Sequence, residues 1–168
     1  MIEILEIKQV NDALAEMVAL FRVELRSYKG IVSKPNIEAG REEIEEYLSA
    51  KFPVYAALVD GEYAGYAVYR IDSEVVWVES IFVKEEYRRH GVATALHSKA
   101  EEIAASYGDD TVYNYVHPNN HRMIEFLRKR GYTVLNLIEI RKPYNDEKLT
   151  QTMICTPNTG HPVLGVFL

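Results

Sequence analysis

The sequence predicts an α/β protein in which a mixed, mainly antiparallel sheet is covered by helices. Two observations predict this class. Three β-type runs in the first half are separated by tight-turn dipeptides, and the chain after residue 89 alternates between helical and β-type periods of apolar residues. The 168 residues, 48% of them hydrophobic and 26% charged, suffice for one domain with its own core.

Two helices are expected before the sheet. Apolar residues from Leu14 to Leu25 share one helical face, Asn11 is a good N-cap, and Gly30 is placed to end this first helix. A loop is expected over residues 33–40, because proline, asparagine and glycine accumulate there. The second helix is then expected to begin at residue 41 and to end at residue 50.

Four glutamates surround the apolar side of this second helix: Glu42, Glu43, Glu45 and Glu46. Together with the net charge of −6, they favour a cationic partner, because complementary charge raises encounter rates. A charge run is also typical of a solvated helix face, and this alternative stays open.

The remaining elements complete the sheet and its cover. A meander of three strands is expected over residues 54–59, 63–71 and 75–83, joined by the turns Asp60-Gly61 and Asp72-Ser73. The elements expected after it are a helix from residue 89 to a stop at Gly108, a strand over 111–116, a helix over 120–130 closed by Gly131, and a strand over 132–140.

Composition excludes several function classes. Lys and Arg number 19 against 25 Asp and Glu, so nucleic acid is not an expected partner. No apolar run approaches the length of a membrane span, and residues 1–10 lack a secretory signal, so a cytoplasmic protein is expected. The single cysteine, Cys155, allows no intrachain disulfide. His117 and His121 are four apart, but Pro118 favours an extended chain there, so no metal site is expected.

The segment Arg88-Arg89-His90-Gly91-Val92-Ala93-Thr94 lies between a predicted strand and the long helix. A glycine at the start of a helix lets the backbone turn tightly, and the first free N–H groups then point outward at the positive end of the helix dipole. This geometry binds a phosphate or pyrophosphate, and two arginines add mobile positive charge at its rim. A tight connection with incidental arginines is the alternative reading. The segment is neither a Walker A loop nor a G-x-G-x-x-G fingerprint.

This segment resembles the pyrophosphate loop of the GNAT superfamily of acyl-CoA-dependent N-acetyltransferases, Arg/Gln-x-x-Gly-x-Gly/Ala. The strand Trp77–Val83 is similar to the family's fourth strand, and Asn120–Met123, followed by Phe126 and Gly131-Tyr132, is similar to its Asn-x-x-Ala helix. The resemblance implies a GNAT-like domain over residues 1–144, with a sheet of six to seven strands, splayed near the fourth and fifth, and helices on both faces.

The resemblance implies that acetyl-CoA is the co-substrate and that its acetyl group moves to a primary amine by direct attack in a ternary complex. The implied cofactor-binding residues lie on the fourth strand, in the loop and at the start of the later helix: Ile81, Phe82, Val83, Arg88, Arg89, His90, Gly91, Val92, Ala93, Thr94 and Asn120. Backbone amides of the strand are expected to polarise the thioester carbonyl.

Glu79 is the candidate general base, because the amine must lose a proton and this carboxylate lies among apolar strand residues. A solvated or salt-bridged position is the alternative. Leu127 stands where many GNAT enzymes carry a tyrosine that protonates the CoA thiolate, so Tyr132, Tyr115 or water would act instead, or the thiolate would leave unaided. The alternative function is a non-catalytic acyl-CoA-binding or interaction module.

The sequence leaves open the role of two tyrosines and the position of the C-terminal segment. Tyr28 and Tyr47 either line an acceptor pocket or pack against other residues. Residues 145–168 form an irregular extension that ends on apolar side chains, Val163 to Leu168. Because their burial would stabilise the protein, the extension is expected to dock on its own domain or on the partner in a homodimer.

Overall fold

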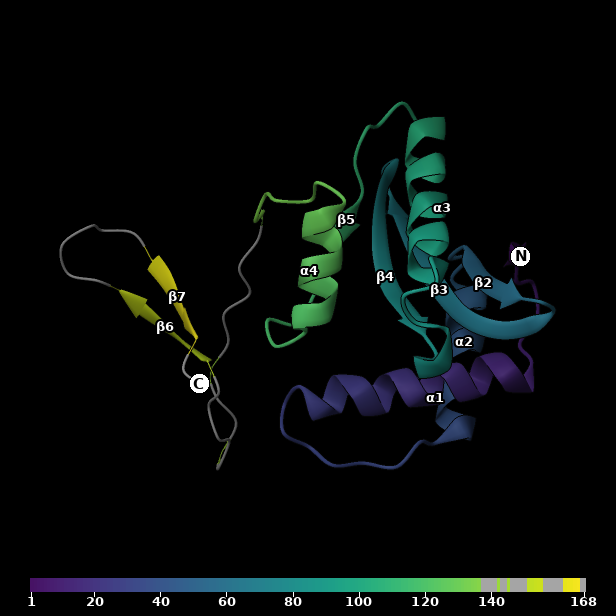
Figure 1. Cartoon of the computed structure of the whole chain (residues 1–168), viewed down its shortest axis with the longest axis horizontal. Coiled ribbons are helices and arrows are strands. Elements are labelled where there is room, and N and C mark those ends of the chain that lie inside the picture. Colours follow the sequence, from purple (N-terminus) through teal and green to yellow (C-terminus); the bar gives the residue numbers. More distant parts are fainter. Residues whose placement is uncertain (137–141, 143–144, 146–150, 156–161, 167–168) are drawn as a thin grey trace. The chain divides into compact units, whose positions relative to one another are not determined.

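The computed structural model describes residues 1–136, 142, 145, 151–155 and 162–166. The chain divides into a first unit, Met1–Ile124, and a second unit, Glu125–Leu168. The elements up to the unit boundary are β1 (Ile2–Glu6), α1 (Asp12–Ser27), α2 (Ile37–Ser49), β2 (Val54–Val59), β3 (Glu62–Asp72), β4 (Val75–Val83), a 3-10 turn (Glu85–Tyr87), α3 (Val92–Ser106), β5 (Tyr113–Asn114) and α4 (His121–Lys129), which crosses it (Figure 1).

The first unit contains a five-stranded sheet in the order β1-β2-β3-β4-β5. The first three pairings are antiparallel and β4 pairs with β5 in parallel, which confirms a mixed, mainly antiparallel sheet. The predicted total of six to seven strands is not confirmed. Residues 132–136 of the predicted last strand are not in a strand, and 137–140 lie outside the described residues.

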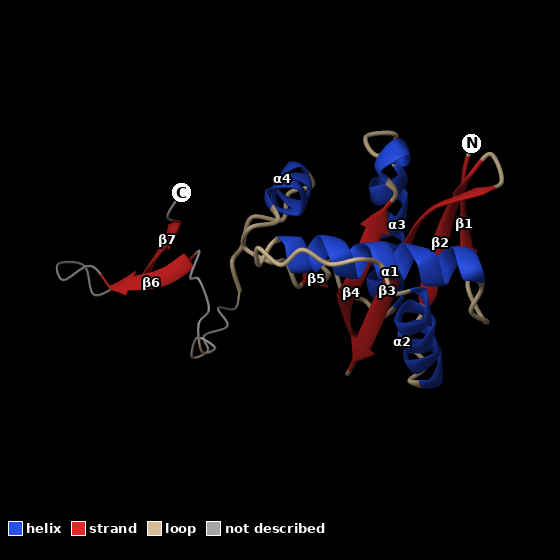
Figure 2. Ribbon diagram, turned by 90° about the horizontal axis from the view of Figure 1, so that it is seen from below, coloured by secondary structure: helices blue, strands red, loops and turns tan. Residues whose placement is uncertain are grey.

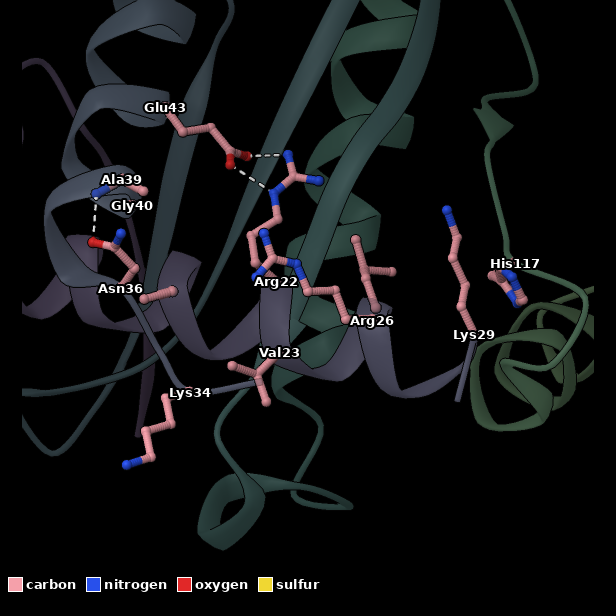
Figure 3. Close-up of a pocket in the computed structure, with 12 residues that line it drawn as sticks. Arg22, Val23, Arg26, Lys29, Lys34, Asn36, Ala39, Gly40, Glu43 and His117 are labelled. Carbon is pink, nitrogen blue, oxygen red and sulfur yellow. Dashed lines mark hydrogen bonds and ion pairs between the residues drawn. The ribbon is translucent and has the colours of Figure 1, made fainter. Parts of the chain in front are cut away.

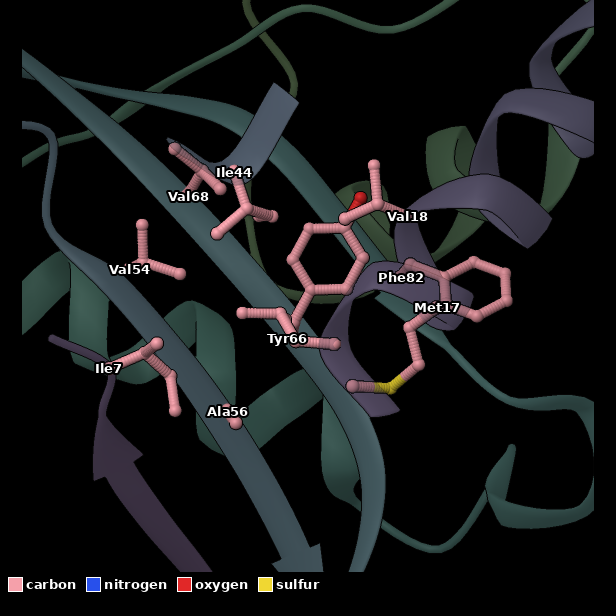
Figure 4. Packing of buried hydrophobic residues seen from close by; sticks show 10 residues of the cluster. Ile7, Met17, Val18, Ile44, Val54, Ala56, Tyr66, Val68 and Phe82 are labelled. Carbon is pink, nitrogen blue, oxygen red and sulfur yellow. The ribbon is translucent and has the colours of Figure 1, made fainter. Parts of the chain in front are cut away.

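Helices cover both faces of this sheet, and Figure 2 shows α1 crossing the strands. Tyr66 and Tyr69 of β3 are three positions apart and therefore face opposite sides. The Tyr66 ring meets Phe21 of α1 edge to face at 6.2 Å, whereas the Tyr69 hydroxyl donates to the Leu96 carbonyl of α3 at 2.5 Å. The core under α1 and α2, partly drawn in Figure 4, joins both helices to β2, β3 and β4.

Close contact between α1 and α2 explains an error in the predicted boundaries. Asn11 caps α1, as predicted, by accepting the Leu14 N–H at 2.9 Å. The predicted loop is wrong from residue 37 onward, because Asn36 caps α2 by accepting the Ala39 N–H at 3.1 Å. Gly40 is therefore a buried helical residue, and a Cβ there would lie 2.3 Å from the Ala15 carbonyl oxygen.

The second unit contains the end of α4 and an antiparallel pair, β6 (Gln151–Cys155) and β7 (Pro162–Val166). The prediction of an irregular extension is wrong for these two segments. Docking of the extension and dimer formation stay predictions, and residues 156–161 and 167–168 lie outside the described residues. Within the described ranges, no helix combines the length and apolar character that crossing a membrane requires.

Candidate active site

One edge of β4 is open where the site was predicted. In the described chain, β5 pairs with β4 only at Trp77 and Val78, so the edge from Glu79 onward has no neighbouring strand. On the other edge, the Lys84 N–H donates to the Ala64 carbonyl of β3 at 2.9 Å. Because backbone groups alternate along a strand, the N–H groups of Ile81 and Val83 point to the open edge.

A β-bulge places Glu79 at this opening. Val68 of β3 pairs with Ser80 and the next residue, Tyr69, pairs with Val78, so Glu79 is the extra residue on β4. Bulges redirect side chains next to the strand interruption. The Glu79 side chain is 31% exposed, and its Oε2 accepts a hydrogen bond from Arg70 Nε at 3.4 Å.

A small cavity of about 40 Å³, which we call the β4 cleft, lies at the opening. Its lining residues come from α1, β4, β5 and the chain around the start of α4: Phe21, Leu25, Val78, Glu79, Ser80, Ile81, Asn114, Tyr115, His117, Asn120 and Met123. The cleft thus brings together predicted site residues 79, 81 and 120, and one alternative proton donor, residue 115. Phe82 and Val83 are buried and do not line it.

The segment after β4 has the backbone that the sequence predicts for a phosphate loop. Gly91 has a φ of +87° and caps α3 without a side-chain hydrogen bond. The first intrahelical bond joins the Ala95 N–H to the Gly91 carbonyl at 2.9 Å, so the N–H groups of residues 92–94 have no acceptor within the helix. Gly91, Arg89, His90 and Thr94 are exposed, Ala93 is half-buried and Val92 is buried. Free amides at a helix start beside an exposed arginine fit a pyrophosphate.

Arg88 has a different position from the expected mobile cation. Its Nε donates to the Val83 carbonyl at 2.9 Å, and its Nη2 donates to Glu24 of α1 at 2.8 Å. Glu24 also accepts a hydrogen bond from the Tyr28 hydroxyl at 2.8 Å and pairs with Arg122. Glu24 therefore fixes the loop to α1, and nothing in its sequence surroundings distinguishes this half-buried glutamate from the other glutamates of an amphipathic helix.

A second cavity, the α1–α2 cavity, has a volume of about 610 Å³ (Figure 3). It is lined by Ala19, Arg22, Val23, Leu25, Arg26, Lys29, Lys34, Asn36, Ala39, Gly40, Glu43 and His117. Leu25 and His117 also line the β4 cleft, so the two cavities are neighbours. Sequence reasoning did not find this cavity, because it depends on the close approach of two helices.

The charge of the α1–α2 cavity differs from that of the protein as a whole. Four Lys or Arg side chains line it, against one carboxylate, Glu43. Glu43 accepts a hydrogen bond from Arg22 Nε at 2.6 Å and holds the pKa of that guanidinium above its usual value, against the lowering effect of burial. Glu42, Glu45 and Glu46 are exposed and do not line the cavity, so they form the solvated face that was the alternative for this charge run.

His117 lies at the junction of the two cavities. Its ring stacks on Tyr28 at 5.8 Å, and its Nδ1 accepts the Asn119 N–H at 3.1 Å. Burial, with the charge of Lys29 as the second cause, lowers the pKa of His117 below its ordinary value. Among the described residues, no group of three or more His, Cys, Asp and Glu side chains is placed to hold a metal ion.

The two tyrosines left open by the sequence pack beside the cavities and line neither of them. Tyr28 stacks on His117, as described above, and hydrogen-bonds to Glu24. Tyr47 stacks on Phe52 at 5.8 Å and donates its hydroxyl hydrogen to Glu43 at 3.1 Å. Tyr28 and Tyr47 therefore contact residues of the site, namely His117, Glu24 and Glu43, without lining either cavity.

Solved structures share this fold over most of the chain. The aminoglycoside N-acetyltransferase AAC(6')-Iy, in complex with the bisubstrate analogue CoA-S-monomethyl-acetylneamine, is 22% identical with a TM-score of 0.60, over 86% of this chain and 99% of that one. The aminoglycoside acetyltransferase meta-AAC0020 from an uncultured soil metagenomic sample, in complex with sisomicin, is 16% identical with a TM-score of 0.60, over 85% and 96%. An acetyltransferase of the GNAT family from Staphylococcus aureus Mu50 is 18% identical with a TM-score of 0.58, over 78% and 84%.

The family assignment rests on the sequence itself. Residues 17–132 match the Acetyltransferase (GNAT) family, and this match includes the β4 edge, the loop at Gly91 and the start of α4. The chain therefore belongs to the acetyltransferase (GNAT) family.

Proposed function

We propose that this protein transfers an acetyl group from acetyl-CoA to a primary amine by direct attack, with both substrates bound together. The observation that carries the proposal is the presence of three features on and directly after β4: the open edge of the strand, the free amides after Gly91, and the β4 cleft that Glu79 lines. Family membership supports acetyl transfer, and solved structures of the same fold hold CoA or aminoglycosides.

The chain's own backbone would hold the co-substrate, whose thioester supplies the acetyl group. The amides of residues 91–94 and the guanidinium of Arg89 would bind the pyrophosphate, with His90 at the rim. The outward N–H groups of Ile81 and Val83 would donate hydrogen bonds to the acyl-bearing arm and polarise its carbonyl. Asn120 lies at the same cleft, with its Oδ1 held by the Met123 N–H at 3.1 Å.

Proton transfer would depend on Glu79. Its carboxylate lines the cleft and retains an exposed surface, so an amine or one water molecule can reach it. Arg70 fixes its orientation through the 3.4 Å hydrogen bond. We propose that Glu79 accepts the proton that the attacking amine loses, directly or through water.

Protonation of the departing thiolate needs another group, because Leu127 has no proton to give. Of the alternatives from the sequence, Tyr115 lines the β4 cleft, where it stacks on Trp77 at 4.9 Å. We propose Tyr115 or water as the donor; unaided departure also remains feasible, because a thiol of pKa about 8.5 is a fair leaving group.

The second candidate function is acyl-CoA binding without turnover, and the leucine at position 127 is the observation that favours it. The two functions differ in one measurable reaction. Thiol release from acetyl-CoA is measured across a panel of primary amines, and CoA binding is measured by calorimetry on the same preparation. Amine-dependent release supports the transferase, whereas tight CoA binding with no release above buffer hydrolysis would support the binding module.

A further inference from the structure

The α1–α2 cavity holds more positive charge than its own carboxylate neutralises. Arg22 is paired with Glu43, but Arg26 and Lys29 have no ion-pair partner among the residues described in the structure. In Figure 3, Arg26 of α1 and Lys29 of the following turn extend to the same side as Arg22, whereas Lys34 points away from them. Arg22 and Arg26 are four residues apart and share one face of α1, and Lys29 lies in the turn that follows the helix, where its N–H donates to the Arg26 carbonyl at 3.0 Å.

This concentration is unusual for a protein with a formal net charge of −6. Placing like charges side by side costs free energy, which a bound anion would recover. His117, at the same wall, adds no charge near pH 7, because burial lowers its pKa. At about 610 Å³ the cavity has room for a small molecule, and its lining carries more cations than carboxylates.

The position of the cavity identifies which substrate would carry the anion. Leu25 and His117 belong to both cavities, so a molecule in the α1–α2 cavity that is long enough to pass these two residues would reach the β4 cleft, which Glu79 lines. The free amides at the start of α3 and the outward β4 amides form a separate proposed binding surface, and none of these residues except Ile81 lines either cavity. A molecule that spans both cavities thus places one end at the carboxylate and the other at the cations.

We infer that the acceptor is an amine that also carries a carboxylate, as an amino acid or a peptide with a free carboxyl terminus does. Arg26 and Lys29 bind this carboxylate. The amine end lies in the β4 cleft and the carboxylate in the α1–α2 cavity. This inference rests on the proposed function and replaces the cationic acceptor that the acidic second helix suggested, since Glu43 is the one glutamate of that run in the lining and it is paired with Arg22. Polycations of the sisomicin kind would be repelled by the same side chains.

The test compares amines that differ only in the anionic group: lysine with 1,5-diaminopentane, tyrosine with tyramine, and O-phosphoethanolamine with ethanolamine. Each is titrated by calorimetry onto the protein saturated with CoA, and each is assayed as an acceptor with acetyl-CoA. We expect at least one carboxylate-bearing member to bind at least tenfold more tightly than its partner. The phosphate pair separates a general anion site from a carboxylate site.

The variant Arg26→Gln/Lys29→Gln tests the assigned side chains. It should weaken binding of the preferred carboxylate acceptor at least tenfold and leave its decarboxylated partner and CoA unchanged. The control Arg128→Gln/Lys129→Gln removes the same charge from exposed side chains of α4 and should change neither.

The outcomes separate failure of this inference from failure of the proposed function. If no carboxylate-bearing member binds better than its partner, or if the double variant weakens CoA binding equally, the inference is wrong. Selective binding of carboxylate amines without thiol release would overturn the proposed transferase and leave the carboxylate site standing.

Discussion

The β4 edge and the α1–α2 cavity are neighbours built from different parts of the chain. The β4 edge and the start of α3 present backbone N–H groups, which every residue type except proline supplies. The α1–α2 cavity presents side-chain charge that depends on which residues occupy α1 and the loop that follows it. The first would therefore suit a co-substrate common to a whole family, and substitution in the second, where we propose that the acceptor binds, would change the acceptor without disturbing the first.

The largest effect is expected from blocking the backbone site. Gly91→Trp should weaken CoA binding on the order of 100-fold or more, because its side chain would lie over the exposed amides of α3. A Cβ at this position meets only Ile2 Cδ1, at 3.6 Å, so the side chain can leave the backbone without a clash, and the protein should fold despite the strain of the positive φ. Calorimetry with CoA measures the loss.

Gly108→Trp is the matched control. Gly108 follows the other end of α3 with a φ of +85°, and nothing lies within 4 Å of a Cβ there. It carries the same backbone strain but no site, so CoA should bind normally. Equal loss of affinity in both variants would show that strain, and not the loop, determines CoA binding.

The next largest effect is expected from separating α1 and α2, the two helices beside the α1–α2 cavity. Gly40→Ala would place a Cβ 2.3 Å from the Ala15 carbonyl oxygen, which belongs to the backbone and cannot turn aside. We expect a loss of about 3 kcal/mol in the free energy of unfolding, although alanine is the better helix former. Denaturant unfolding measures this value, and Glu45→Ala, on the exposed side of α2, should leave it nearly unchanged. An equally stable Gly40→Ala variant would mean that the two helices separate at little cost.

The junction of the two regions is tested by Glu79→Gln. The amide cannot accept the proton of the amine, so kcat should fall roughly 100-fold and the acidic limb of the pH–rate profile should flatten. KM for acetyl-CoA should not change, because the CoA site uses backbone groups. Glu42→Gln removes an exposed glutamate and serves as the control. Full activity of the Glu79 variant would assign the residue only to its ion pair with Arg70.

The same division explains what the sequence could predict. The backbone site depends on a local pattern, a glycine after a strand and before a helix, and Gly91 was found where the pattern placed it. Gly40 was assigned to a loop. A glycine is needed there because α1 passes too close for a side chain, at Ala15, which is 25 positions away in the sequence. The edge strand β1 was not predicted at all, since five residues are too few for a clear alternation.

The face of the sheet to which the Glu79 side chain points could not be predicted from the sequence either. Strand alternation fixes a side chain's face only while the pairing is regular, and the bulge opposite Val68 and Tyr69 interrupts it. The role of Glu24 depends on Arg88 and Arg122, which are 64 and 98 positions away in the chain. Contacts of this kind need the folded chain to be seen.

The smallest effect concerns electrostatic communication inside the α1–α2 cavity. Burial is the main cause of the lowered pKa of His117 and the charge of Lys29 is the second, so Lys29→Gln should raise that pKa only part of the way toward 6.5. Proton NMR of the imidazole measures it. Lys34→Gln, which removes a charge that points away in Figure 3, should leave it unchanged.

The direction of the pKa shift also determines how His117 affects the pH dependence of stability. Because its pKa is lower in the folded than in the unfolded protein, the unfolded chain binds more protons as the pH falls below about 6.5, and the folded state loses stability until the pH passes the folded pKa. Lys29→Gln should make this loss smaller, as seen by thermal melting between pH 7 and about pH 5. An unchanged His117 titration in the variant would place Lys29 too far from the imidazole to act on it, and would weaken the assignment of one shared anion site to Arg26 and Lys29.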